Sequence, residues 1–218
     1  MKKHYWIFAL LLCISLEIKA QDYLNNGLLF PQFKEGIVIY KNFSRVNALL
    51  NYNTLEEEIL FVDTENTIMA LADPSTVIAV IIDDRRFVFA QQDAFFEEIA
   101  IGNDRYFYIQ YKSKLISQGK GVGYGSHSAT ASVTSISSVQ GKGGDYRQLK
   151  TDEIFETKVE RNFYLKINNK YKNIKNIKML GKLFKGREAE IEDFAKKENI
   201  DFGKAVDIAK ILTYCYGL

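Results

Sequence analysis

The chain has 218 residues, of which 29 are lysine or arginine, 27 are aspartate or glutamate, two are histidine and two are cysteine. This near balance of charge argues against a nucleic-acid-binding domain, because neutralisation of phosphates requires a strongly basic surface. Two histidines and two cysteines are also too few for a short-spaced zinc cluster. We therefore expect no nucleic-acid partner, no metal and no cofactor.

Residues 1–20 have the features of a secretory signal peptide. Lysines near the start precede an apolar stretch over residues 5–16, and a cleavage point follows Ala20. This stretch is much shorter than the roughly 20 apolar residues that a membrane-spanning helix needs. Lipid attachment at Cys13 is disfavoured because the bulky Leu12 precedes it, although an uncleaved interfacial anchor stays open as an alternative.

Cleavage after Ala20 changes the chemistry of the remaining chain. The segment removes three lysines and one glutamate, which leaves 26 basic and 26 acidic residues. One cysteine, Cys215, and one histidine, His127, survive, so no intramolecular disulfide can form. We expect an exported protein that is periplasmic, outer-membrane-associated or secreted, with at most peripheral membrane association.

Residues 21–116 are predicted to form an antiparallel β domain. Short apolar runs alternate with turn residues, and no helical pattern long enough for a βαβ unit intervenes. Residues 93–99 are too short for periodicity to distinguish a strand from a helical turn. The predicted strands are Gly36–Tyr40, Arg45–Tyr52, Glu58–Val62, Thr67–Ala72, Val77–Ile82, Arg86–Ala90 and Tyr106–Lys112.

Residues 117–144 differ from their surroundings because they are rich in glycine and serine and contain no acidic residue. Such a composition buries little apolar area, so a flexible loop is the expected structure. Alternation of alanine and valine with serine and threonine over residues 129–134 also allows a strand that forms on docking to a partner. The candidate partner-binding residues of this loop are Lys120, Tyr124, His127 and Lys142.

Residues 145–176 are predicted to add further strands to the β domain, and residues 177–218 to form a helical tail. Two aromatic-rich runs, 163–168 and 171–175, flank the pair Asn169–Lys170, which is typical of a hairpin. The apolar period then becomes helical, with two to three short helices. The expected fold class is mainly β, an antiparallel meander, small barrel or sandwich, with this helical tail, and α+β overall.

Residues 161–187 form a basic stretch, with nine lysines and arginines and no acidic residue, and an acid-rich stretch follows. A basic face of this kind attracts anionic lipid headgroups or envelope glycans. Two alternatives stay open: the stretch docks against the acidic one, or its lysines are solvated and cover apolar surface with their stems. The candidate partner-binding residues here are Lys166, Lys170, Lys172, Lys175, Lys178 and Lys182.

No residue is assigned a catalytic role. A nucleophile–histidine mechanism needs a rigidly held imidazole, and His127 lies in the Gly/Ser-rich segment. Paired carboxylates for glycoside hydrolysis can be drawn from Glu57, Glu97 or Asp83, but no pattern singles out a pair.

The tail MLGKLFKGREAEIEDFAKKENIDFGKAVDIAKILTYCYG, together with the run GIVIYKNFSRVNALLNYNTLEEEILFVD and the turn Ala72-Asp73-Pro74, resembles a group of uncharacterised exported proteins of Bacteroidota-type Gram-negative bacteria. The resemblance covers most of the exported chain. It implies the fold and the compartment and transfers no catalytic residue.

These observations together favour a non-enzymatic exported envelope protein that binds another macromolecule. The expected partner is an envelope protein or an anionic envelope component. The alternatives are a carboxylate-dependent hydrolase acting on envelope glycans and an adaptor on an anionic membrane surface.

Overall fold

A computed structural model describes residues 27–122, 126–127 and 153–217. The predicted signal segment, residues 1–20, lies outside these ranges, as do the side chains of residues 115–156. The structure therefore does not test the export of the chain or its resemblance to exported proteins, and both stay predictions.

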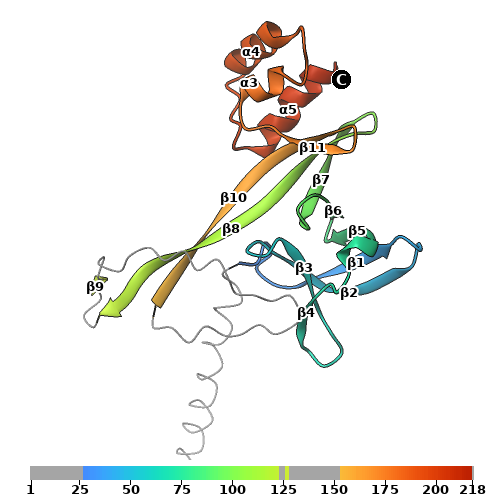
Figure 1. Cartoon of the computed structure of the whole chain (residues 1–218), viewed down its shortest axis with the longest axis vertical. Helices are drawn as coiled ribbons and strands as arrows, with labels where there is room; N and C mark the ends of the chain where they lie inside the picture. The colour runs from blue at the N-terminus through green and yellow to red at the C-terminus, as the bar shows by residue number, and fades with distance from the viewer. Residues whose placement is uncertain (1–26, 123–125, 128–152, 218) are drawn as a thin grey trace, which may run out of the picture.

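The described chain is an antiparallel β protein with a C-terminal helical tail, which confirms the predicted fold class (Figure 1). The strands pair in the spatial order β11-β10-β8-β7-β6-β5-β1-β2-β3-β4, and β9 pairs with β8 outside this path. The bounds are β1 Lys34–Tyr40, β2 Arg45–Asn53, β3 Glu58–Val62, β4 Ile68–Ala70, β5 Val77–Ile82, β6 Arg85–Phe89, β7 Phe95–Gly102, β8 Arg105–Val122, β9 Ser126–His127, β10 Glu153–Ile167 and β11 Lys170–Asn173.

Each predicted strand of the β domain is present, and the ambiguous residues 93–99 belong mostly to β7. The prediction was wrong at the start of the Gly/Ser-rich segment. β8 continues to Val122 instead of giving way to a loop at Ser117, and β9 pairs with its end. The reason is a partner strand: β10 pairs with β8 as far as Lys120, so glycine-rich backbone is held by hydrogen bonds despite its low strand preference.

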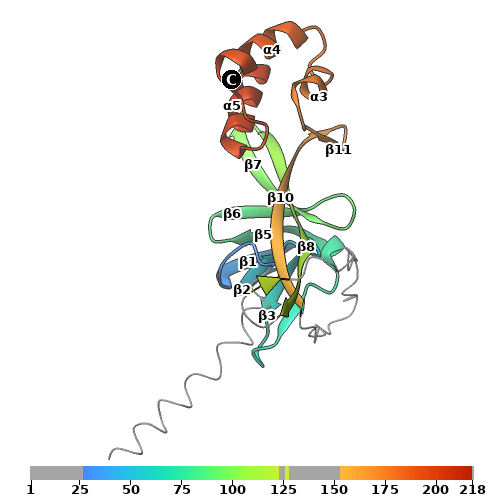
Figure 2. The ribbon, with the colours of Figure 1, turned by 90° about the vertical axis from the view of Figure 1, so that its left-hand side faces the viewer.

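β8 and β10 are the longest strands and extend along much of the long axis of the molecule (Figure 1). Together they run from the helical tail toward the end occupied by β1 to β4 (Figures 1 and 2). β10 is much longer than the hairpin arm predicted over residues 163–168. The turn after it is Asn168–Asn169, not Asn169–Lys170, because a two-residue hairpin turn needs left-handed backbone at both positions and asparagine adopts it readily.

The sheet curls so that the turn between β2 and β3 meets β7 and β8. The Ser113 amide donates to the Thr54 carbonyl at 2.7 Å, and the Phe95 amide donates to the Glu57 carbonyl at 3.1 Å. The Tyr52 hydroxyl also donates to the Phe95 carbonyl at 2.9 Å. These bonds close one end of the sheet around its core and hold β7 and β8 in position.

The two faces of β7, β8 and β10 have different surroundings. One face contributes Phe107, Phe163 and Leu165 to a large core that continues into the helices through residues such as Ile208. We call this the covered face. The other contributes Phe96 and Tyr108 to a small aromatic cluster in which no described helix residue takes part. We call it the open face.

The helical tail consists of α3 Ile177–Gly181, α4 Glu188–Lys197 and α5 Ala205–Tyr216, which confirms a tail of three short helices. The Asn176 side chain accepts from the Met179 amide at 3.0 Å and caps α3. Gly217 ends α5 in left-handed backbone, φ 68°. Within the described residues, no helix is both long and apolar enough to cross a membrane.

Candidate functional site

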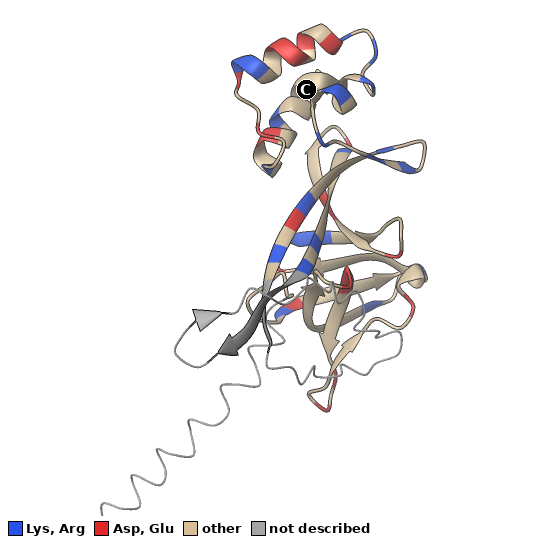
Figure 3. Ribbon diagram, turned by 60° about the vertical axis from the view of Figure 1, so that its left-hand side comes forward, with Lys and Arg blue, Asp and Glu red and all other residues tan. Residues whose placement is uncertain are grey.

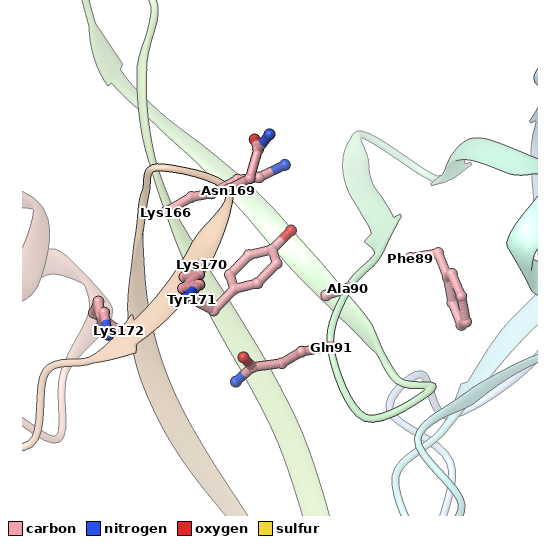
Figure 4. A pocket seen from close by; sticks show the side chains of 8 residues that line it. All are labelled: Phe89, Ala90, Gln91, Lys166, Asn169, Lys170, Tyr171 and Lys172. Atoms are coloured by element: carbon pink, nitrogen blue, oxygen red, sulfur yellow. The ribbon is translucent and has the colours of Figure 1, made fainter.

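A shallow pocket of about 490 Å³ lies between the β6–β7 turn and the β10–β11 hairpin (Figure 4). The two elements are far apart in the sequence, and in the strand order β7, β8 and β10 lie between β6 and β11. The pocket is lined by Phe89, Ala90, Gln91, Lys166, Asn169, Lys170, Tyr171 and Lys172. The lining therefore contains three lysines and two carboxamides but no carboxylate.

Two tight turns fix the walls of this pocket. Gln92 and Asp93 have φ of 60° and 57°, and the Ala90 amide donates to the Ala94 carbonyl at 2.8 Å. On the other side Asn168 and Asn169 have φ of 50° and 60°. Left-handed pairs of this kind suit two-residue hairpin turns, whose twist matches that of the flanking strands. The backbone conformation of the two turns therefore fixes the walls of the pocket without a ligand.

Strand register decides which side chains enter the pocket. Lys166 pairs directly with Tyr171, so both side chains project from the open face. Lys170 and Lys172 alternate with Tyr171 and project from the other face. Figure 4 agrees, because the Lys172 side chain points away while Tyr171 and Gln91 face each other across the gap.

Tyr171 forms the aromatic wall of the pocket. Its ring packs edge-on with Phe96 and Tyr108, at centroid distances of 5.2 and 5.0 Å. The Lys166 ammonium lies 5.5 Å from the Tyr171 ring centroid. Burial raises the pKa of Tyr171, and the nearby Glu98 carboxylate adds to this, so the hydroxyl stays protonated and can donate a hydrogen bond.

The lysines around the pocket are exposed and make no ion pair within the described residues. The acidic residues of the tail instead pair with basic residues near or within the tail itself, as in Lys196–Glu192 at 2.9 Å and Lys210–Glu198 at 2.6 Å. In Figure 3, which colours the ribbon by residue type, several of the Asp and Glu positions of the tail lie along α4. The predicted docking of the basic stretch against the acidic one holds only at its C-terminal end, where α3 contacts α4 and Arg187 pairs with Glu190 at 3.0 Å.

The predicted partner-binding residues divide into three groups. Lys166, Lys170 and Lys172 come together at the pocket. Lys175, Lys178 and Lys182 are exposed but lie beyond it, between β11 and the end of α3. Of the others, Lys120 and His127 lie on β8 and β9 with side chains outside the described part, and Tyr124 and Lys142 lie outside it entirely.

Gln91, Asn169 and Tyr171 were missed as site residues by the sequence reasoning. Gln91 lies in a β6–β7 turn whose position opposite β11 depends on the strand order. Asn169 and Tyr171 had signals, a turn residue and an aromatic beside the lysines, but an aromatic in a strand is usually read as core.

Glu97, one of the carboxylates considered for catalysis, is held on the covered face. Arg85 donates to both of its oxygens, at 2.7 and 2.8 Å, and the Tyr111 hydroxyl donates at 2.6 Å. The Arg85 guanidinium also lies 4.9 Å from the centroid of the Phe30 ring. This set of contacts fits a structural ion pair.

Glu57, the other buried carboxylate, reaches the opposite face of β8. Gln110 Nε2 donates to its Oε2, and Lys112 Nζ lies 2.6 Å from its Oε1. Gln110 and Lys112 alternate with Tyr111 along the strand, so Glu57 and Glu97 lie on opposite sides of the sheet. Each is occupied by its own partners, and the two do not converge on one cleft.

No cluster of histidine, cysteine, aspartate and glutamate suited to a metal ion occurs among the described residues. In comparisons with known proteins, the chain matches no family model, no curated protein and no solved structure. The functional argument therefore rests on the geometry of this molecule.

Proposed function

We propose that this protein is a non-enzymatic, exported binding protein of the cell envelope, which contacts an anionic macromolecule through the hairpin surface. We define the hairpin surface as Lys166, Lys170, Lys172 and Lys175 with the pocket beside them. The observation that supports the proposal is the charge arrangement. These four lysines are exposed and make no ion pair within the described residues, and three of them, Lys166, Lys170 and Lys172, line a pocket without a carboxylate.

An anionic partner is attracted by this arrangement of lysines. Lys166 and the pair Lys170 and Lys172 project from opposite faces of the β10–β11 hairpin, and their unpaired ammonium groups sum to a positive potential around it that attracts a polyanion. Each lysine near an anionic surface contributes about 1 kcal/mol, and the attraction decays over about 10 Å at 0.1 M salt. Binding of this kind is favoured by a rigid surface, and the two tight turns keep the walls of the pocket rigid.

The hydrolase alternative has less support from the geometry. Glycoside hydrolysis by two carboxylates needs them roughly 5–9.5 Å apart across one substrate site. The two buried carboxylates, Glu57 and Glu97, face opposite sides of the sheet and are each engaged by basic or amide groups. Binding to an anionic envelope component instead involves lysines that make no ion pair within the described residues.

Co-sedimentation with isolated Gram-negative envelopes tests the proposal. The variant replaces Lys166, Lys170 and Lys172 by glutamine, and the matched control replaces Lys41, Lys158 and Lys197, which are also exposed, by glutamine. Because both variants lose three charges, only the position of the charge differs. We expect the hairpin variant to bind about 100-fold more weakly at low salt and the control to lose far less.

Equal losses in the two variants would mean that net charge, not the hairpin surface, governs binding, and would reject the proposal. Vesicles of anionic lipid are compared with envelopes from which lipid has been extracted. Binding to the vesicles alone would favour a membrane-surface adaptor instead.

A further inference from the structure

We infer that the pocket holds one acidic sugar unit of an acidic polysaccharide, with Lys166 on its carboxylate and the carboxamides of Gln91 and Asn169 on its hydroxyls. This inference rests on the proposed function and names the class of its anionic partner. It combines the unpaired ammonium, the neutral hydrogen-bonding groups and the aromatic wall, which occur together at this pocket.

The polar groups of the pocket suit a ring that carries many hydroxyls and one charge. A carboxamide both donates and accepts, as a sugar hydroxyl does, so Gln91 and Asn169 can each satisfy one hydroxyl in either role. The Tyr171 hydroxyl is kept protonated by burial and adds a donor. A single ammonium, that of Lys166, projects from the same face as Tyr171 and pairs with one carboxylate.

The aromatic wall suits the apolar C–H face of a sugar ring. Tyr171 is held in place by ring contacts with Phe96 and Tyr108 on the open face. Phe96 in turn stacks on Tyr164, at a centroid distance of 4.9 Å. Because the ring is fixed before binding, little side-chain entropy is lost when a ligand packs against it.

A folded protein partner fits this surface less well. Protein interfaces are anchored by apolar and aromatic side chains at a centre that becomes fully buried. The large apolar side chains that are exposed in this molecule, such as Phe43, Met69 and Val206, are none of them in the pocket lining. A hydrated, charged polymer needs no such centre.

The remaining lysines indicate a polymer instead of a single sugar. Lys170 and Lys172 lie two residues apart on one side of β11, about 7 Å along the strand. Lys175 follows after the strand ends. Because β11 is an edge strand, a chain with one unit in the pocket can pass over this edge and place further carboxylates beside these ammonium groups on the other face, which increases affinity without further pockets.

Isothermal titration calorimetry on the full exported protein tests the inference with short oligomers of galacturonate, mannuronate and glucuronate. The methyl ester of each oligomer, which keeps the ring and hydroxyls but has no charge, is the matched ligand control. We expect at least one acid oligomer to bind and its ester to bind at least 10-fold more weakly. Lys166→Gln and Gln91→Ala should each weaken acid-oligomer binding at least 5-fold, whereas Lys41→Gln should not change it.

Two competitors separate this inference from the proposed function. If inorganic phosphate or oligoglutamate displaces the envelope component as well as the acid oligomers do, the site recognises charge without a sugar ring, and the inference is overturned while the proposed function stands. The same conclusion follows if no acid oligomer binds but replacement of Lys166, Lys170 and Lys172 still weakens envelope binding. If that replacement does not weaken envelope binding, both the inference and the proposed function are overturned.

Discussion

The two faces of the central strands contain the same trio of side chains in different surroundings. On the covered face Arg85 makes two hydrogen bonds to Glu97, which also accepts from Tyr111. On the open face the next residues along β6 and β7, Arg86 and Glu98, form a similar group with Tyr108 of β8, with one bond of 2.7 Å and one of 3.2 Å. Glu97 is 6% exposed and Glu98 15%.

This difference shows that burial, not residue type, decides what an ion pair does here. Three aromatic rings, including those of Phe30 and Phe87, lie against the Arg85 guanidinium and leave its side chain 27% exposed. Arg86 has a side chain 41% exposed to solvent, which screens its attraction to Glu98. The covered pair therefore holds the core together, and the open pair borders a surface that is available for binding.

The largest expected effect comes from removing charge on each face in turn. Glu97→Gln leaves Arg85 unpaired among aromatic rings, so we expect a loss of about 3 kcal/mol in the free energy of unfolding. Glu98→Gln should lose less than about 1 kcal/mol, because solvent already satisfies much of Arg86. Urea denaturation measures both. Equal losses would show that the two faces are energetically alike.

The sequence could predict the strands but not this division between faces. Short apolar runs bounded by turn residues mark β1 to β6, whereas periodicity does not decide residues 93–99, which lie mostly in β7. In the adjacent pairs Arg85–Arg86 and Glu97–Glu98, which member is buried depends on the aromatic rings that pack around Arg85. One of these rings belongs to Phe30, which lies far from Arg85 in the sequence, so no local pattern encodes the contact.

An intermediate effect is expected from the aromatic cluster on the open face. Phe96 is fully buried and contacts both Tyr164 and Tyr171. Phe96→Leu should cost about 1–2 kcal/mol through lost ring contacts and a small cavity. It should also weaken acid-oligomer binding, since Tyr171 loses its support.

The matched control for Phe96→Leu is Phe107→Leu, which empties similar volume on the covered face. It should cost a comparable or larger free energy of unfolding and leave oligomer binding unchanged. A binding loss in Phe107→Leu of the same size would mean that stability alone, and not the support of Tyr171, governs the pocket.

A smaller effect is expected from Cys215, whose thiol is buried where α5 packs into the covered-face core. Burial raises its pKa to about 11, against an ordinary value of 9.0. Because the folded-state pKa is the higher one, the stabilisation is complete below pH 9 and is lost as the pH rises toward 11. Between pH 8 and pH 10 the free energy of unfolding should fall by about 1 kcal/mol more in the wild type than in Cys215→Ala. Thermal melts at the two pH values measure this difference.

The candidate site was half predictable for the same reason as the faces. A run without acidic residues identifies Lys166, Lys170 and Lys172, because charge is a property of the local sequence. The pocket beside them needs Gln91, which comes from a turn brought near only by the pairing of β6, β7, β8 and β10. Recognition groups contributed across a sheet are invisible until the strand order is known.

The smallest expected effect on stability belongs to the hairpin lysines, which are exposed, in contrast to the buried Glu97. Lys170→Gln with Lys172→Gln removes two exposed charges that make no ion pair within the described residues, so the free energy of unfolding should change by less than about 0.5 kcal/mol. Envelope binding should nevertheless fall by about 10-fold or more, because each ammonium contributes separately to attraction of a polyanion. Glu97→Gln should show the reverse, a large loss of stability with unchanged binding at temperatures where it stays folded. If instead the two lysines stabilise the fold as strongly as Glu97 does, they serve the β10–β11 hairpin itself and the partner must bind elsewhere.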